Sequence, residues 1–130
     1  MSRALDDLDP RFRWVAFEFL ARLTEAGIAV MIVSTRRTPE EHAENLRRGV
    51  SWTTHSKHLD GLAMDVCPYN TWLLHGADKL EWNADDAVWE TIADLAEHLG
   101  LRSGYRWTQK DCGHVEYVVL PETAPAPTHV

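Results

Sequence analysis

The sequence predicts an α+β fold in which helices pack on a small antiparallel sheet, with the functional site at one end of the sheet. Capped segments with helical periodicity alternate with short apolar or alternating runs that are typical of strands. The 130 residues, 45% of them hydrophobic, suffice for one core that buries about two thirds of the unfolded surface. We expect one domain over residues 1–120. Residues 121–130, rich in proline and alanine, are expected to be a disordered C-terminal tail.

A first helix is expected from Pro10 to about Ala26. Asp9 can cap it, Pro10 suits its first turn and Gly27 can end it. The apolar stripe of this helix is expected to consist of Trp14, Phe17, Leu20, Ala21 and Leu23. The continuous apolar run 28–33 follows and predicts a buried strand.

A second helix is expected over 39–48, where Thr38 and Glu41 form a capping-box pattern around a proline. Glu41 is therefore interpreted as a cap partner and not as a catalytic acid. A third helix, capped within 83–86, is expected to reach Leu99. Its apolar face should carry Trp89, Ile92, Ala93 and Ala96.

The segment 61–67 is expected to be a strand whose two faces differ. Its apolar face carries Leu62, Met64 and Val66. Asp65 therefore points the opposite way, and Gly61 allows a close approach to the loop before the strand. Another strand is expected within 101–107. A further strand should begin at His114, whose alternation places Glu116 on the same face.

His58, Asp65 and His114 form a candidate ligand set for a catalytic zinc ion, which takes three protein ligands and keeps a position for water. Such a water loses a proton at about pH 7. Asp111, three residues before His114, is placed to accept that proton as a general base. Each of these residues alone is more often a surface or turn residue. Their combination favours metal-assisted hydrolysis.

The segment 56–65, SKHLDGLAMD, resembles the Ser-x-His-x-x-Gly-x-Ala-x-Asp signature of zinc D-alanyl-D-alanine carboxypeptidases and the related L-alanyl-D-glutamate endopeptidases of bacteriophages. The segment 111–116 resembles their second signature, Asp-x-x-His followed by an apolar residue. Gly113 stands where many relatives carry proline, which is expected to loosen this turn. The resemblance covers about residues 10–120 and implies a Hedgehog/D-Ala-D-Ala-peptidase-like fold. It also implies zinc binding by His58, Asp65 and His114, with Asp111 as catalytic acid/base.

A third stretch, 33–46, resembles the family segment in which an arginine contacts the substrate. Arg37 is the best match, and Arg36 is adjacent. Such an arginine can hold a substrate carboxylate or stabilise the oxyanion of amide hydrolysis. Ser56 matches the signature serine and is a candidate substrate-binding residue. His42 stands where the family usually has glutamine.

The resemblance implies a zinc metallopeptidase that cleaves the stem peptides of peptidoglycan. The N-terminus has acidic residues where a signal peptide has its apolar core, so synthesis in the cytoplasm is expected. This feature and the small size favour a phage-type endolysin that reaches the cell wall after holin-type release and cuts the L-alanyl-D-glutamate bond. The alternatives are a D-alanyl-D-alanine carboxypeptidase and a non-catalytic, metal-containing cell-wall-binding module.

Composition disfavours several other classes. The net charge of -7 opposes binding to nucleic acid phosphates. No apolar run approaches the roughly 18 residues that a membrane-spanning helix needs, so no membrane insertion is expected. Two cysteines are too few for a disulfide framework. We expect Cys67 and Cys112 to be reduced and not to bind the metal, and the protein to be a monomer.

Overall fold

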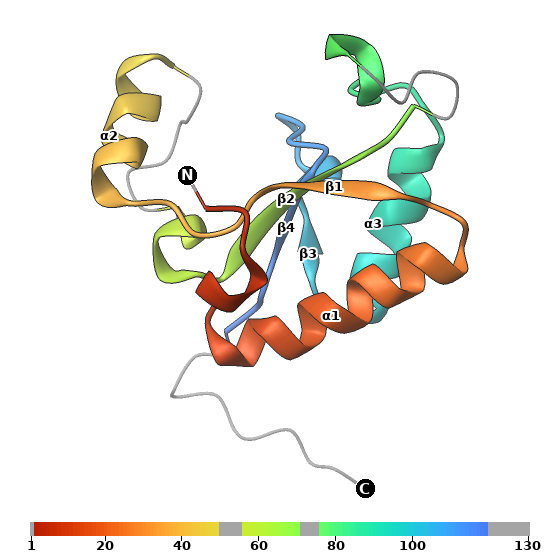
Figure 1. Ribbon diagram of the computed structural model, residues 1–130, viewed down its shortest axis with the longest axis horizontal. Helices are drawn as coiled ribbons and strands as arrows, with labels where there is room; N and C mark the ends of the chain where they lie inside the picture. Colours follow the sequence, from red (N-terminus) through yellow and green to blue (C-terminus); the bar gives the residue numbers. More distant parts are fainter. Residues whose placement is uncertain (1, 50–55, 71–75, 120–130) are drawn as a thin grey trace, which may run out of the picture.

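The computed structural model describes residues 2–49, 56–70 and 76–119 (Figure 1). The expected tail over 121–130 lies outside the described residues. Within these residues the helices and strands follow in the order α1 (Pro10–Glu25), β1 (Val30–Ser34), α2 (Pro39–Arg47), β2 (Ala63–Pro68), α3 (Val88–His98), β3 (Arg102–Ser103) and β4 (His114–Glu116). The predicted α+β fold is confirmed.

The strands form one antiparallel sheet in the order β1-β2-β4-β3. Met64 and Val66 of β2 and Val115 of β4 face a core that α1 and α3 complete. The opposite face of these two central strands carries the polar residues, and Asp65 pairs directly with His114. The alternation read from the sequence therefore places the candidate site on the face away from α1 and α3 (Figure 1).

The beginning of α1 agrees with its sequence signals, but its predicted apolar stripe was correct only at Leu20 and Leu23, which pack in or against the core. Asp9 caps the helix by accepting a hydrogen bond from the Arg11 backbone, and Pro10 occupies the first turn. The buried residues are Phe12, Ala16, Phe19 and Leu23. These recur at intervals of four, three and four, which gives one helical face. Trp14 and Phe17 lie outside it and are 74% and 40% exposed.

The capping box of α2 is confirmed, because the Thr38 hydroxyl accepts from the Glu41 backbone and the Glu41 carboxylate accepts from the Thr38 backbone. The buried face of α3 consists, as predicted, of Trp89, Ile92, Ala93 and Ala96. This helix begins only at Val88, because the segment before it forms local turns in which Asp86 accepts from the Val88 backbone. The strand expected within 101–107 is short, since a 3-10 turn begins at Gly104.

None of the described helices is both long and apolar enough to cross a membrane.

Candidate functional site

His58 lies on a short 3-10 helix, Lys57–Asp60, immediately before β2. The Ser56 hydroxyl caps this helix by accepting from the His58 backbone N–H. Gly61 ends it with φ of +70°, and a Cβ there would lie 2.9 Å from the Asp9 backbone nitrogen. Glycine thus permits both the left-handed turn and the close approach that bring His58 over the sheet.

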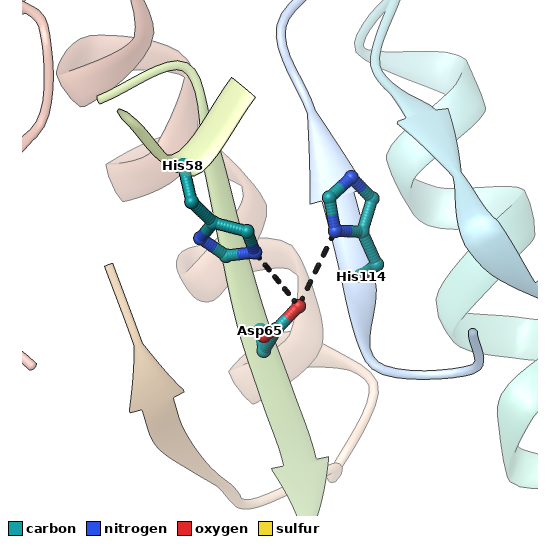
Figure 2. A group of neighbouring side chains, drawn as sticks. All are labelled: His58, Asp65 and His114. Atoms are coloured by element: carbon teal, nitrogen blue, oxygen red, sulfur yellow. Dashed lines mark ion pairs between the residues drawn. The ribbon is translucent and has the colours of Figure 1, made fainter. Parts of the chain in front are cut away.

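One ring nitrogen of His58 is hydrogen-bonded to the backbone. Its Nδ1 lies 2.7 Å from the Thr35 carbonyl oxygen, which can only accept, so Nδ1 carries the proton. The unprotonated Nε2 then faces Asp65, 3.3 Å from its Oδ1 (Figure 2). This geometry leaves a ring lone pair directed at the centre of the site.

His114 has the opposite arrangement. Its Nε2 lies 2.8 Å from Oε1 of Glu116. Burial raises the pKa of Glu116, but contacts with His114 and Lys57 outweigh this and lower the pKa to about 2. Because Glu116 is a carboxylate and only accepts, it holds the proton on Nε2. Nδ1 of His114 therefore faces Asp65, 3.4 Å from Oδ1 (Figure 2).

Asp65 lies between the two imidazoles. Its Oδ2 accepts a hydrogen bond of 2.8 Å from the Ser34 hydroxyl. Its Oδ1 and Nε2 of His58 are both buried without a hydrogen-bond partner. Burial raises the pKa of Asp65, but contacts with His114 and His58 outweigh this and hold the pKa well below its usual range.

These three side chains fit a zinc ion. One ligand atom from each of His58, Asp65 and His114 lies within 4.8 Å of the other two. Two imidazole nitrogens and one carboxylate oxygen are typical ligands of a catalytic zinc site. Buried polar atoms without a partner are rare in proteins, and a cation at this point would satisfy them. In the metal-free protein burial lowers the pKa of His114, but Asp65 and Glu116 raise it to about 9.

Asp111 lies at the edge of this cluster. Its Oδ2 is 3.8 Å from Nδ1 of His114, and its side chain is 42% exposed. Two backbone hydrogen bonds stabilise the turn that contains Asp111: the Asp111 N–H donates to the Gly104 carbonyl, and the His114 N–H donates to the Asp111 carbonyl. Burial and then repulsion from Asp65 raise the pKa of Asp111. The carboxyl group is thus beside the ligands and reachable by a substrate.

Gly113 packs this turn tightly against β2. The Val66 backbone donates to the Gly113 carbonyl, and a Cβ on Gly113 would lie 2.4 Å from the Val66 carbonyl oxygen. Glycine here serves a close backbone approach. The expectation that glycine loosens the turn was wrong.

The two candidate arginines occupy different environments. Arg37 is half-buried, and its backbone donates to the His58 carbonyl. Its Nη1 lies 3.2 Å from Nδ1 of His42, which must accept because a guanidinium only donates. Its charge also acts on the Asp111 carboxyl, whereas Arg36 is exposed. The structure therefore brings Arg37 to the site.

Ser56 is 6% exposed, and its hydroxyl contacts the local backbone. Substrate contact by this residue stays a prediction.

Several residues around the ligands were not identified from the sequence as site residues. Ser34 and Thr35 come from the end of β1, and only the pairing of β1 with β2 places them there. Trp107 packs against His114 with ring centroids 5.0 Å apart. Glu116 could have been found, since strand alternation puts it on the face of His114.

Cys67 and Cys112 are free thiols in the structure. Neither belongs to the group of metal-ligating residues found within the described part of the chain. Burial raises the pKa of both thiols, that of Cys67 to about 12.

Comparison with known proteins shows similarity to a family and to solved structures. A family model described as D-alanyl-D-alanine carboxypeptidase matches residues 49–117, more than half of the chain. The crystal structure of the Serratia marcescens L-Ala D-Glu endopeptidase ChiX is similar, with a TM-score of 0.66 and 25% sequence identity. The similarity covers 88% of this chain and 83% of that one. No curated protein matches the sequence.

Proposed function

Since the chain belongs to the D-alanyl-D-alanine carboxypeptidase family of peptidases, we propose that it is a zinc-dependent peptidase of peptidoglycan stem peptides that cuts the L-alanyl-D-glutamate bond. The observation that carries this proposal is the convergence of three ligand atoms from His58, Asp65 and His114 beside the Asp111 carboxyl. The similarity to an L-Ala D-Glu endopeptidase over most of both chains supports the choice of bond.

His58, Asp65 and His114 would hold the zinc ion through Nε2, Oδ1 and Nδ1. When bound, the ion would supply a water of lowered pKa and polarise the scissile carbonyl. The Thr35 carbonyl keeps the imidazole of His58 in the tautomer that binding requires. The site is thus organised for its ligand before substrate arrives.

Asp111 would move the proton in both halves of the reaction. It accepts a proton from the attacking water while the water oxygen bonds to the amide carbon. It then donates that proton to the amide nitrogen as the C–N bond breaks. The raised pKa of Asp111 suits the second step, because it brings the pKa of the carboxyl group closer to neutral pH.

Arg37 would contact the substrate as a fixed cation, holding either its carboxylate or the oxyanion. Arg37→Ala is therefore expected to lower kcat/KM by about 10²-fold, the effect of removing one such donor. Arg36→Ala is the matched control, because the neighbouring side chain is exposed, and it should stay close to wild type. Steady-state kinetics separate the two roles, since loss of a carboxylate contact raises KM and loss of oxyanion stabilisation lowers kcat. Equal losses in both variants would refute this role.

Digestion of purified muropeptides followed by mass spectrometry tests the proposed bond. New N-terminal D-glutamate is expected. Released D-alanine would instead establish the alternative, a D-alanyl-D-alanine carboxypeptidase, which the description of the matching family favours. Zinc-loaded protein that cleaves neither bond would support the second alternative, a non-catalytic wall-binding module.

The phage-type endolysin role, with holin-type release and a monomeric enzyme, is part of the same proposal. Purified protein added to permeabilised bacteria should reduce their turbidity and release stem-peptide fragments. A lytic role would be contradicted if the protein cleaved soluble peptides but left the cell walls intact.

A further inference from the structure

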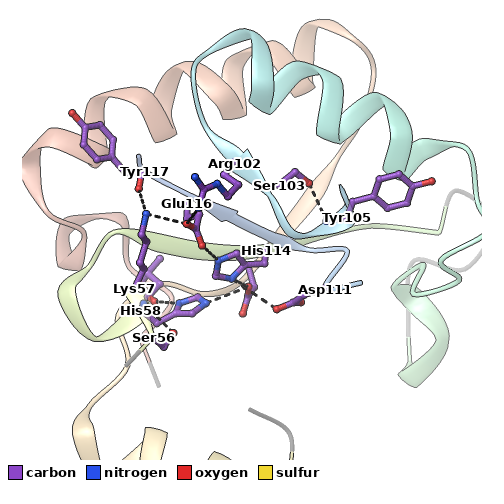
Figure 3. Close-up of polar contacts among 12 residues, drawn as sticks. Ser56, Lys57, His58, Arg102, Ser103, Tyr105, Asp111, His114, Glu116 and Tyr117 are labelled. Carbon is purple, nitrogen blue, oxygen red and sulfur yellow. Dashed lines mark hydrogen bonds and ion pairs between the residues drawn. The ribbon is translucent and has the colours of Figure 1, made fainter. Parts of the chain in front are cut away.

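The carboxylate of Glu116 bridges two parts of the chain that each carry a candidate zinc ligand. Its Oε1 accepts from Nε2 of His114 at 2.8 Å, and its Oε2 lies 2.9 Å from Nζ of Lys57 (Figure 3). The Glu116 side chain is only 8% exposed. A buried carboxylate is strongly destabilising unless it is paired, so these contacts, together with Nη1 of Arg102 at 3.7 Å from Oε2, stabilise it there.

Lys57 extends this contact to the loop that presents His58. It directly precedes His58, and its Nζ also donates to the Tyr117 carbonyl at 2.8 Å. Backbone hydrogen bonds join the same two segments, since the Leu62 N–H donates to the Lys57 carbonyl and the Tyr117 N–H donates to the Leu62 carbonyl. Lys57 and Glu116 therefore join the His58 loop to β4, which carries His114.

The geometry also explains why His114 needs a partner that only accepts. His114 faces Asp65 with Nδ1, whereas His58 does so with Nε2. A proton on Nδ1 of His114 would occupy the direction in which a metal must bind. A carboxylate against Nε2 keeps the proton on Nε2 and leaves Nδ1 as the ligand atom.

We propose that Glu116 is a positioning residue of the zinc site, which fixes the Nε2–H tautomer of His114 and, through Lys57, the placement of His58 relative to His114. This inference rests on the proposed zinc site. It assigns opposite tautomers to the two histidine ligands.

The first test uses the zinc-loaded wild-type protein. Long-range ¹H–¹⁵N correlation spectra are expected to show the imidazole proton of His114 on Nε2 and that of His58 on Nδ1. A proton on Nδ1 of His114 would overturn the inference. This measurement needs no variant, so it decides the tautomer even if changes at Glu116 prevent folding.

The second test measures zinc affinity by competition with a chromogenic chelator. Glu116→Ala is expected to weaken zinc binding by about 10- to 100-fold, the usual effect of removing such a partner of a metal ligand. Glu116→Gln retains a carbonyl acceptor, so it should keep the His114 tautomer and recover much of the affinity. Lys57→Met should weaken binding while His114 keeps its proton on Nε2.

Glu97→Ala is the matched control, because it removes an exposed carboxylate of α3 that pairs with Arg106, and it should leave zinc affinity unchanged. A folded Glu116→Ala protein that binds zinc within twofold of wild type would overturn the inference. Unchanged affinity in Lys57→Met would overturn the link to His58. A wild type that binds no zinc would overturn both this inference and the proposed function, whereas failure of the variants alone would leave the proposed function standing.

Discussion

Asp111→Asn is expected to lower kcat by about 10²- to 10⁴-fold, the usual contribution of a general acid–base group, while zinc stays bound. An amide cannot accept the proton of the attacking water at neutral pH. Zinc should remain because Asp111 lies outside the cluster of His58, Asp65 and His114. The kcat of Asp111→Asn and of the wild type on muropeptides should be compared, with zinc content measured on the same samples.

Asp78→Asn, which changes an exposed aspartate in the same way, is the control and should keep wild-type activity. Near-normal turnover in Asp111→Asn would contradict the assignment of Asp111 as the base. Loss of zinc from this variant would instead indicate that Asp111 is a ligand.

The raised pKa of Asp111 also predicts a direction for stability. Folding raises this pKa, so the contribution of Asp111 to stability is present at low pH and is lost as pH rises through the raised value. At neutral pH the ionised group is therefore destabilising in the metal-free fold. Asp111→Asn should raise the Tm of the chelated protein at pH 7, and an unchanged or lowered Tm would contradict the raised pKa.

Removal of zinc is expected to abolish hydrolysis and to lower the Tm. A ligand present at a thousandfold its Kd stabilises the folded state by about 4 kcal/mol, which corresponds to a Tm change on the order of 10 °C for a domain of this size. Activity and Tm should return when zinc is added after chelation. Full activity in protein shown to be free of metal would refute a zinc mechanism.

Asp65→Ala should reproduce the effect of chelation, because it removes one of the three ligand atoms, and added zinc should not restore activity. Asp94→Ala is its control, since it removes an exposed carboxylate that pairs with Arg106.

Zinc must displace the proton of His114, whose pKa is raised to about 9 in the metal-free protein. Zinc affinity is therefore expected to weaken as the pH falls below that value, and titrations at several pH values would measure this.

The fold was predictable wherever local signals were unambiguous. The caps of α1 and α2 depend on residues within one turn of the helix, so Asp9 and Thr38 could be identified directly. The buried face of α1 could not, because apolar residues occupy more than one stripe. Packing on α3 and the sheet selected Phe12 and Phe19 and left Trp14 exposed.

The candidate site divides in the same way. By itself the sequence determined the candidate ligand types, the places of Asp65 and His114 on polar strand faces, and the acid Asp111 beside His114. Side-chain chemistry and strand alternation are local properties, so one segment at a time suffices to recognise them. The tertiary structure alone decided that Nε2 of His58, rather than Nδ1, faces Asp65. This choice depends on the Thr35 carbonyl, which comes from a segment far from His58 in the chain, and no spacing within one segment can encode such a contact.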